Sequence, residues 1–327
     1  MPQTATTFSP PTVHALGGDT MGTTWSVQVV ASRDLDLHAL HRDIQQVLDR
    51  VVAQMSTWEA DSDISRFNRA SAGQWHAIPA EFLQVLRAAL KIAEASDGAF
   101  DPTVGGLVGL WGFGAQAQPH GRLDELQHRR VAADAGWHRL QLDVPGSRIL
   151  QTGGLSLDLS AIAKGYGVDA VADALRSRQL PAALVEVGGE LLGFGRKPDG
   201  TPWRVLLESN PEEESAADLE PRVLELDGTA VATSGDRWHS YEHEGERLSH
   251  TLDPRTAKPV AHASAGVTVL AESAMQADAW ATAMTVLGAD AGLALAERLG
   301  LAVRFVDRGA QGLQERSSSA MSAHWSA

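Results

Sequence analysis

Two short stretches of the sequence could together bind a phosphate ligand and a hard metal ion. The first is LDLSAIAKGYGVDAVADAL, in which Asp158 ends a short apolar strand and Ser160 can cap the helix that follows. The start of a helix exposes unpaired N–H groups that suit an anion. Lys164 adds a positive charge one turn later, and the glycines beyond it allow close approach. The alternative is an ordinary capped helix with a solvent-facing lysine.

The second stretch is ESAMQADAWATAMTVLG. On a helix, Asp278 and Thr282 have i,i+4 spacing, so their side-chain oxygens share one face. A carboxylate beside a hydroxyl offers two ligands to a cation such as Mg²⁺. The small residues Ala277, Ala281 and Ala283 are expected to leave this surface open to close approach. The alternative is a Thr–Asp pair on the surface of an amphipathic helix.

A histidine in RLSHTLDPRTAKP could act as a base. Asp253 and Pro254 set a turn, which places His250 just before it at a strand end. A histidine with a pKa near neutrality can accept the proton of a hydroxyl nucleophile. The alternative is a structural histidine held by hydrogen bonds. His239 and His243 also have i,i+4 spacing, but no HExxH pattern surrounds them, so we interpret both as structural.

Two apolar side chains could contact a planar ligand. Met21 precedes the first predicted strand, and Trp58 lies in the polar loop STWEADSDISRFN. Methionine and tryptophan offer dispersion and stacking contacts to a heterocycle, although packing in the core is the alternative for both. The paired glycines of VEVGGELLGFG do not open a helix, so they make a poor dinucleotide-binding fingerprint.

Size and composition indicate a globular protein that does not bind nucleic acid. The chain has 327 residues, of which 43% are hydrophobic and 21% charged, enough for one large domain or two intimately packed ones. Its formal net charge of −14 disfavours contact with a phosphate backbone. A local basic pocket could still hold a small phosphate ligand. The absence of cysteine excludes disulfides, thiolate metal sites and thiol nucleophiles.

The two ends carry no clear targeting signal. Residues 1–18 are expected to form a flexible lead-in without the pattern of a signal peptide, and residues 311–327 a flexible tail. No run of about eighteen apolar residues occurs, so we expect no membrane span. A cytoplasmic location is predicted, or a periplasmic one if a leader has been removed.

Helices and hairpin-like strands mix without regular βαβ alternation, which predicts an α+β fold. We expect one domain over residues 19–310, with two closely packed lobes that divide near residue 150 around a single site. Apolar spacing of three and four predicts helices. They span residues 37–55, 79–95, 123–135, 160–180, 273–287 and 290–299.

Taken together, these stretches resemble the ApbE family of flavin transferases. The resembling blocks occur in the family's order and extend from Met21 to Gly288. They are MGTTWSV, MSTWEADSDISRFN, GAFDPTVGGLVGLWGFG, LDLSAIAKGYGVDA, VEVGGELLGFG, PWRV, VATSGD, LSHTLDPRTAKP and ADAWATAMTVLG. Each block is weakly specific by itself, whereas their ordered set is strongly specific.

The resemblance implies an α+β fold that binds FAD and Mg²⁺, with Mn²⁺ as the other metal that could serve. Family members move FMN from FAD onto a threonine hydroxyl of a target flavoprotein through a phosphoester bond, with release of AMP. Some members mainly hydrolyse FAD to FMN and AMP. An FAD pyrophosphatase is therefore the nearest alternative, and a non-catalytic FAD-binding protein is the alternative from another class.

The resemblance also assigns roles to residues. His250 matches the histidine thought to act as base, and Asp278 is expected to be essential for catalysis as well as for metal binding. The metal ligands are expected to be Asp278, Thr282 and, through its carbonyl, Ala161. The positions expected to contact the flavin nucleotide are Met21, Trp58, Ala99, Phe100, Asp101, Asp158, Lys164 and Leu252.

Two departures from the family's pattern concern the metal. Some relatives have a side-chain oxygen at the position of Ala161 and an aspartate at that of Ala281. Carbonyls and water would therefore have to complete the shell in this chain, which bears on metal affinity and on the balance between transfer and hydrolysis. Many relatives are exported lipoproteins, but a chain without cysteine lacks the residue that carries such a lipid.

Overall fold

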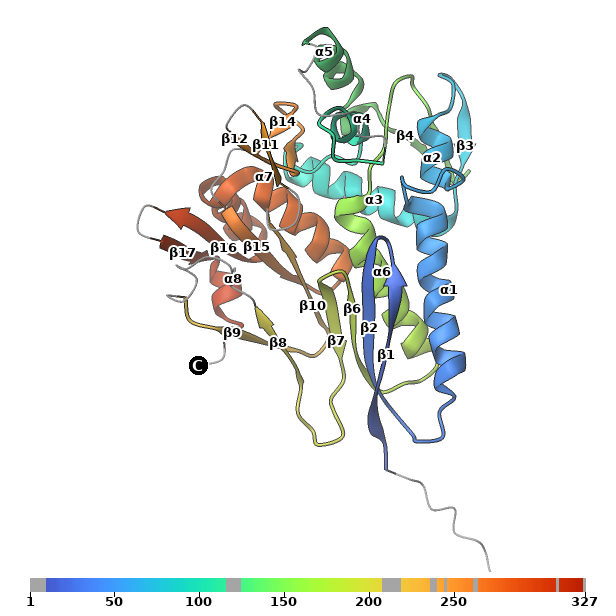
Figure 1. The fold of residues 1–327 in the computed structure, drawn as a ribbon, viewed down its shortest axis with the longest axis vertical. Helices are drawn as coiled ribbons and strands as arrows, with labels where there is room; N and C mark the ends of the chain where they lie inside the picture. Colours follow the sequence, from blue (N-terminus) through green and yellow to red (C-terminus); the bar gives the residue numbers. More distant parts are fainter. Residues whose placement is uncertain are drawn as a thin grey trace, which may run out of the picture.

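The computed structural model describes residues 10–115, 125–207, 219–235, 240–243, 246–260, 264–309 and 312–325. Of residues 240–243 and 246–248 it describes the backbone alone. Helices and antiparallel strands are mixed along the chain (Figure 1), which confirms the predicted α+β class.

The centre of the fold is an eight-stranded sheet in the order β1-β2-β6-β7-β10-β15-β16-β17, and every neighbouring pair in it is antiparallel. Strands from both halves of the chain join in it, since β2 pairs with β6 across the predicted divide near residue 150. The strands are β1 (Thr12–Thr20), β2 (Thr23–Ala31), β6 (Ala182–Val187), β7 (Glu190–Phe194), β10 (Thr229–Ser234), β15 (Ser264–Ala271), β16 (Ala302–Gly309) and β17 (Gly312–Ser317).

Helices cover one face of this sheet (Figure 1). Here α1 (Leu37–Met55), α6 (Ser160–Ser177) and α7 (Ala274–Leu299) pack side by side on alternate residues of the strands. The opposite face is covered by the hairpin of β8 (Trp203–Leu207) and β9 (Arg222–Leu226), together with α8 (Ser319–Ser322). Two apolar layers therefore enclose the sheet, which is the physical basis of the core.

Short elements surround the upper end of the helices in Figure 1. These elements lie outside the large sheet, and the strands among them pair in small sheets of their own. They are α2 (Asp63–Asn68), β3 (Trp75–Ala77), α3 (Ala80–Ala95), α4 (Gly105–Leu110), α5 (Glu125–Asp134), the 3₁₀-helix η1 (Trp137–Arg139), β4 (Gln141–Asp143), β5 (Arg148–Leu150), β11 (Ser240–His243), β12 (Glu246–Ser249), β13 (Leu252–Asp253) and β14 (Lys258–Pro259).

Regular structure reaches further toward both ends than the sequence predicted. Residues 12–18 belong to β1, so the expected flexible lead-in is wrong for them, and residues 1–9 lie outside the described residues. The expected flexible tail is wrong for β17 and α8, where Met321 is fully buried. Both segments pair or pack with residues far along the chain, which local composition does not reveal.

Helix α7 crosses the core. The two helices predicted on either side of residue 288 form one element with a kink at Gly288, whose φ is 71°. Within the described residues, α7 is the one helix long and apolar enough to cross a membrane, but 67% of its most apolar window is buried inside the fold. Its apolar composition is accounted for by the core that it occupies.

Helices α6 and α7 approach each other most closely at Gly165. A Cβ atom there would overlap the carbonyl oxygen of Ala274 and lie 2.8 Å from Cα of Met275. The Gly165 N–H instead donates to Oδ2 of Asp278 at 3.0 Å, a hydrogen bond that joins the two helices. A glycine is required here because backbone meets backbone.

An aspartate on α6 caps α7. The carboxylate of Asp169 accepts hydrogen bonds from the Ser273 hydroxyl at 2.6 Å and from the N–H groups of Ala274 at 2.8 Å and Met275 at 2.9 Å. These donors are among the unpaired groups of the first turn of α7, where negative charge is favoured. The cap fixes the start of α7 against the middle of α6.

We expect Gly165→Ala to lower the free energy of unfolding by roughly 2 kcal/mol. An overpacking cost of about 3 kcal/mol exceeds the gain of about 1 kcal/mol in helix propensity. Urea unfolding followed by tryptophan fluorescence measures the change. Gly167→Ala on the same helix is the control, because its Cβ would meet only the flexible ends of Met21 and Leu48, at 3.2 and 3.3 Å. Equal stability of the two variants would contradict the close-approach argument.

We expect Asp169→Asn to destabilise the fold by about 1–2 kcal/mol, because an amide nitrogen would replace an oxygen that accepts from N–H groups at the start of α7. Thermal unfolding by circular dichroism checks this. The matched control is Asp173→Asn, four residues further along α6, whose exposed carboxylate pairs with Arg176 within its own helix. A control variant as unstable as Asp169→Asn would show that the cap is not responsible.

Candidate active site

Lys164 lies between two buried carboxylates. Its Nζ is 3.2 Å from Oε1 of Glu190 and 3.6 Å from Oδ1 of Asp278. Glu190 and Asp278 are 4% and 5% exposed, respectively. The three side chains come from α6, the first residue of β7 and α7, so the core brings together residues far apart in the sequence. The two stretches that we predicted to form one site do meet.

The charges in this cluster would not balance if both carboxyl groups were ionised. Burial disfavours the charged form of Lys164, but the neighbouring Asp278 and Glu190 outweigh it and raise the pKa of the ammonium. Burial, opposed mainly by Lys164, raises the pKa of Asp278. Burial and the charge of Asp278 raise the pKa of Glu190 to about 8. One ammonium therefore faces two desolvated carboxyl groups, and burial favours the uncharged form of Glu190 until a further positive group is placed beside it.

The same cluster offers a set of oxygen ligands. In a regular helix the N–H of residue 165 would donate to the carbonyl of residue 161, but here it donates to Asp278. The carbonyl oxygen of Ala161 therefore does not have the N–H of Gly165 to itself, because that N–H donates to Asp278. Thr282 follows Asp278 by one turn and is half-buried. A carboxylate, a hydroxyl and a carbonyl are hard ligands that fit Mg²⁺ or Mn²⁺.

No group of three or more His, Asp or Glu side chains in the described part of the chain is placed to hold a metal ion. Mg²⁺ does not require one, because it keeps several waters and is bound through one or two carboxylates together with substrate phosphates. The residues present therefore fit such an ion.

One expectation about α7 is wrong. Ala277, Ala281 and Ala283 do not leave an open surface, since each is at most 1% exposed and packs into the main core. The reason is that α7 is buried around most of its circumference. Asp278 faces α6, where it contacts Lys164 and Gly165, and Thr282 one turn further is half-buried.

Asp158 lies at the edge of a cavity of about 140 Å³. Its Oδ1 accepts hydrogen bonds from the N–H of Ser160 at 2.8 Å and from the Ser160 hydroxyl at 2.6 Å. Ser160 is thus the first helical residue and does not cap α6, contrary to the prediction. The cavity is lined by Thr57, Ser65, Asn68, Gly105, Gly106, Val108, Gly109, Leu110, Gly114, Ala115, Gln127, Val131, Ser156, Leu157 and Asp158.

The segment before Asp158 is not the strand that we expected. Asn68 donates to the carbonyl of Leu157 at 2.9 Å and accepts from its N–H at 2.7 Å. The buried amide of Gln151 likewise donates to the carbonyl of Leu155 and accepts from its N–H. Side-chain amides and two backbone hydrogen bonds to residues 102 and 105 thus hold this segment, which is not part of a regular strand.

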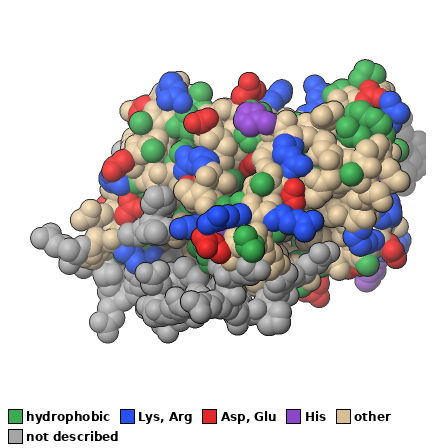
Figure 2. Space-filling view, turned by 90° about the horizontal axis from the view of Figure 1, so that it is seen from above, with side chains coloured by type: hydrophobic (Ala, Val, Ile, Leu, Met, Phe, Trp, Pro, Cys, Tyr) green, Lys and Arg blue, Asp and Glu red, His purple; other side chains and the backbone are tan. Residues whose placement is uncertain are grey.

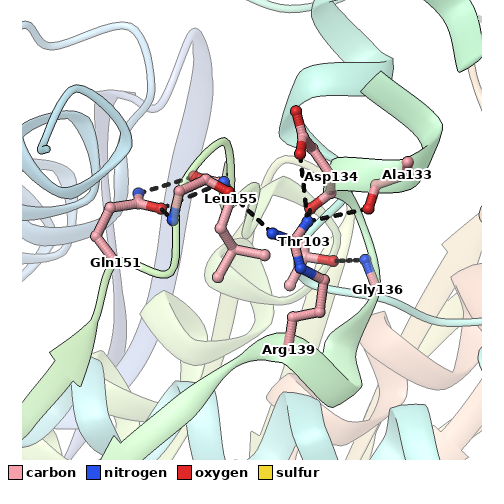
Figure 3. A network of polar contacts seen from close by, with 8 residues as sticks. Thr103, Ala133, Asp134, Gly136, Arg139, Gln151 and Leu155 are labelled. Carbon is pink, nitrogen blue, oxygen red and sulfur yellow. Dashed lines mark hydrogen bonds and ion pairs between the residues drawn. The ribbon is translucent and has the colours of Figure 1, made fainter. Parts of the chain in front are cut away.

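The other side of this segment is fixed by an arginine (Figure 3). Arg139 donates to the carbonyls of Ala133 and Asp134 at the end of α5, and to the carbonyl of Gly153 at 2.9 Å. The end of α5, η1 and the loop that leads to Asp158 are therefore held as one unit. This network sets where the wall of the cavity lies.

The predicted flavin-contacting residues Ala99, Phe100 and Asp101 turn their side chains inward, and all three are buried. Asp101 accepts from the N–H and hydroxyl of Thr103, at 2.8 and 2.6 Å, and from the N–H of Trp137 at 2.9 Å. Burial raises the pKa of Asp101, although these hydrogen bonds oppose the rise. The side chain of Asp101 thus organises the protein, and a ligand contact would involve the backbone.

Met21 and Trp58 occupy opposite environments. Met21 has a φ of 49° in the two-residue turn between β1 and β2, and its methyl group lies beside Gly167 of α6. Trp58 is 72% exposed, in a loop where Ser56 accepts from its N–H. The core-packing alternative is therefore wrong for Trp58, whose indole is open to a ligand.

His250 and Leu252 lie beside α4 and the segment that follows it. Leu252 packs with Leu107 of α4 and with Ala257. The ring of His250 is 6.4 Å from that of Phe113, in an edge-on arrangement. Since α4 lines the cavity that contains Asp158, these residues adjoin the same region. His239 and the side chain of His243 lie outside the described residues.

Sequence reasoning missed Glu190. Its signal was present, because an acidic residue opens the otherwise apolar strand ELLGF directly after two glycines. The upper face of the molecule bears Lys and Arg side chains among Asp and Glu (Figure 2), so the net negative charge does not exclude positive groups beside the site. The arrangement as a whole can hold a cation and the phosphates of an anionic ligand next to a cavity.

The ApbE family's sequence profile matches residues 21–305. A protein of Vibrio cholerae named FAD:protein FMN transferase is 37% identical over 94% of this chain and 91% of its own length. An Escherichia coli protein of the same name is 34% identical over 90% of this chain and 84% of its own.

Solved structures of the same kind share the fold. The apo form of flavinyl transferase ApbE from Pseudomonas stutzeri superposes with a TM-score of 0.89 at 39% identity, covering 97% of this chain and 98% of that one. Flavin transferase ApbE from Vibrio cholerae gives 0.88 at 35% identity, covering 96% and 100%. Because these matches extend over nearly the whole sequence and fold, this chain belongs to the ApbE family.

Proposed function

We propose that this chain is an FAD:protein FMN transferase that attaches FMN to a threonine hydroxyl of a target flavoprotein and releases AMP. The observation that carries the proposal is the buried cluster of Lys164, Asp278 and Glu190, together with Asp158 at the edge of the cavity, just before the helix that carries Lys164. The names of the relatives support the choice of FAD and protein as substrates.

In the proposed reaction the threonine oxygen forms a bond to the phosphorus of the FMN half of FAD. The bond from that phosphorus to the bridging oxygen breaks, and AMP leaves with the bridging oxygen and its electron pair. The threonine proton passes to a base, for which His250 is the candidate. Lys164 would neutralise charge that develops on the phosphate oxygens.

We propose that Asp278, Thr282 and the carbonyl of Ala161 hold Mg²⁺, with Mn²⁺ as a substitute. Bound there, the ion would supply Lewis-acid stabilisation to the pyrophosphate oxygens. Met21, Trp58, Ala99, Phe100, Asp101, Asp158, Lys164 and Leu252 remain the proposed contacts of the flavin nucleotide. Trp58 is the exposed aromatic group among them and suits stacking.

The direct test is the intact mass of an acceptor flavoprotein domain after incubation with FAD, Mg²⁺ and this protein. A gain equal to one FMN phosphoester supports transfer. Chromatography of the same mixture without acceptor addresses the alternatives. Rapid formation of FMN and AMP there would indicate a pyrophosphatase, and FAD that stays bound but intact in both mixtures would indicate a binding protein.

We expect Asp278→Asn to reduce both AMP release and FMN transfer by at least about 100-fold, because a catalytic metal ion supplies several kcal/mol of charge stabilisation. Chromatography of AMP and in-gel flavin fluorescence measure the two activities. The control is Asp290→Asn on the same helix, since its exposed carboxylate pairs with Arg316 away from the site. Normal Mg²⁺-dependent turnover by Asp278→Asn would rule out the metal assignment.

We expect His250→Ala to reduce transfer by about 10²–10⁴-fold, the usual contribution of a general base, while FAD binding is retained. In-gel fluorescence of the acceptor reports transfer, and quenching of flavin fluorescence reports binding. His38→Ala, on the exposed side of α1, is the control. Labelling at the wild-type rate by His250→Ala would remove its role as base.

A further inference from the structure

We propose that Glu190 is a positioning residue that holds the ammonium of Lys164 while Asp278 binds the metal ion. The inference rests on the proposed function, since it takes Asp278 as a metal ligand. Glu190 itself has been given no role above.

The geometry favours Glu190 as the principal partner of Lys164. The Nζ–Oε1 distance of 3.2 Å is shorter than the 3.6 Å from Nζ to Oδ1 of Asp278. Asp278 is also engaged through Oδ2 by the N–H of Gly165. Oε2 of Glu190 is fully buried and has no hydrogen-bond partner among the described residues. A carboxylate with spare capacity in such a place is costly unless a positive group stays beside it.

The sheet, not a loop, sets the position of Glu190. It pairs with Val187 across the two-residue turn of Gly188 and Gly189, whose φ values are 58° and 100°. A Cβ at Gly188 would lie 2.8 Å from Cγ2 of Thr23 and 3.2 Å from Cδ of Lys164. The turn therefore packs on the stem of Lys164, and β7 delivers the carboxylate to its charged end.

Charge explains why a second acid is needed. If Asp278 were the only carboxylate, a metal ion would have to displace Lys164 from it, and two positive groups would then share one negative group. With Glu190 present, the ammonium keeps a carboxyl partner when Asp278 turns to the metal, so Lys164 and the metal ion do not compete for the same oxygens. Glu190 acts on the metal through Lys164 and need not touch it.

The test measures metal binding without substrate. Mn²⁺ is titrated into the FAD-free protein, and the free ion is followed by electron paramagnetic resonance. We expect Glu190→Gln to weaken binding about tenfold, within the range found for residues that support metal ligands. Glu190→Asp, which keeps the charge, should restore part of the affinity. Glu186→Gln is the matched control, because Glu186 lies on the same hairpin but contacts Gly189 and Ser26.

A second background separates positioning from direct ligation. In Lys164→Met, the further change Glu190→Gln should alter Mn²⁺ affinity less than threefold or so, because the residue through which Glu190 acts is gone. A tenfold loss in both backgrounds would make Glu190 a metal ligand and overturn the proposal. Melting temperatures identify any variant that fails to fold. If Glu190→Gln fails to fold, the Mn²⁺ affinity of Glu190→Asp is compared in the two backgrounds instead.

Activity supplies an independent measure. The Mg²⁺ concentration that gives half-maximal AMP release should rise about tenfold in Glu190→Gln, whereas a purely structural role would lower the maximal rate and leave that concentration unchanged. Suppose that the wild-type protein binds Mn²⁺ and releases AMP, and that the metal dependence of Glu190→Gln is unchanged. This result would overturn the role of Glu190 and leave the proposed function standing. A wild-type protein that neither binds the metal nor turns over FAD overturns the proposed function as well.

Discussion

The contact between α6 and α7 at Gly165 is the constraint on which the candidate site depends. Because Gly165 has no side chain, the backbone of α6 reaches that of α7, and its N–H bonds directly to Asp278. Lys164, the preceding residue, is thereby carried to the same carboxylate. Asp169, one turn further along α6, fixes the first turn of α7 in the matching register. A bulkier residue at 165 would separate the helices and with them the two halves of the site.

Burial of the charged groups in the site costs free energy, and the apolar packing of the core has to offset that cost. Two carboxyl groups and one ammonium are taken out of water in one cluster, an arrangement that weakens the fold by itself. It persists because α6, α7 and β7 are each anchored by extensive apolar packing on the large sheet. Preorganised charge on rigid elements is what binding of a metal ion and phosphates requires, since little reorganisation is left for the moment of binding.

Local pattern predicted the elements, and the i,i+4 spacing correctly placed Asp278 and Thr282 on one helix. The α+β class followed from the order of those elements. What the sequence could not provide depends on long-range contacts. The approach to Asp158 looked like a strand, yet its backbone is paired by Gln151 four residues earlier and by Asn68 from a distant part of the chain. Glu190 was not predicted as a site residue, because its contact with Lys164 forms only in the fold, where β7 meets α6. The alanines of α7 were misjudged since periodicity does not tell how many sides of a helix are covered.

The parts of the site differ in how they are supported. The charged cluster is built into the main core, where α6, α7 and the large sheet share one apolar interior. His250, by contrast, lies between the short strands β12 and β13, and the neighbouring Leu252 is anchored by a separate small cluster around α4. The groups proposed to hold phosphate and metal are thus fixed independently of the proposed base. Such a division allows the segment that carries the proposed base to vary without disturbing the charges proposed to hold the nucleotide, because the two depend on different packing contacts.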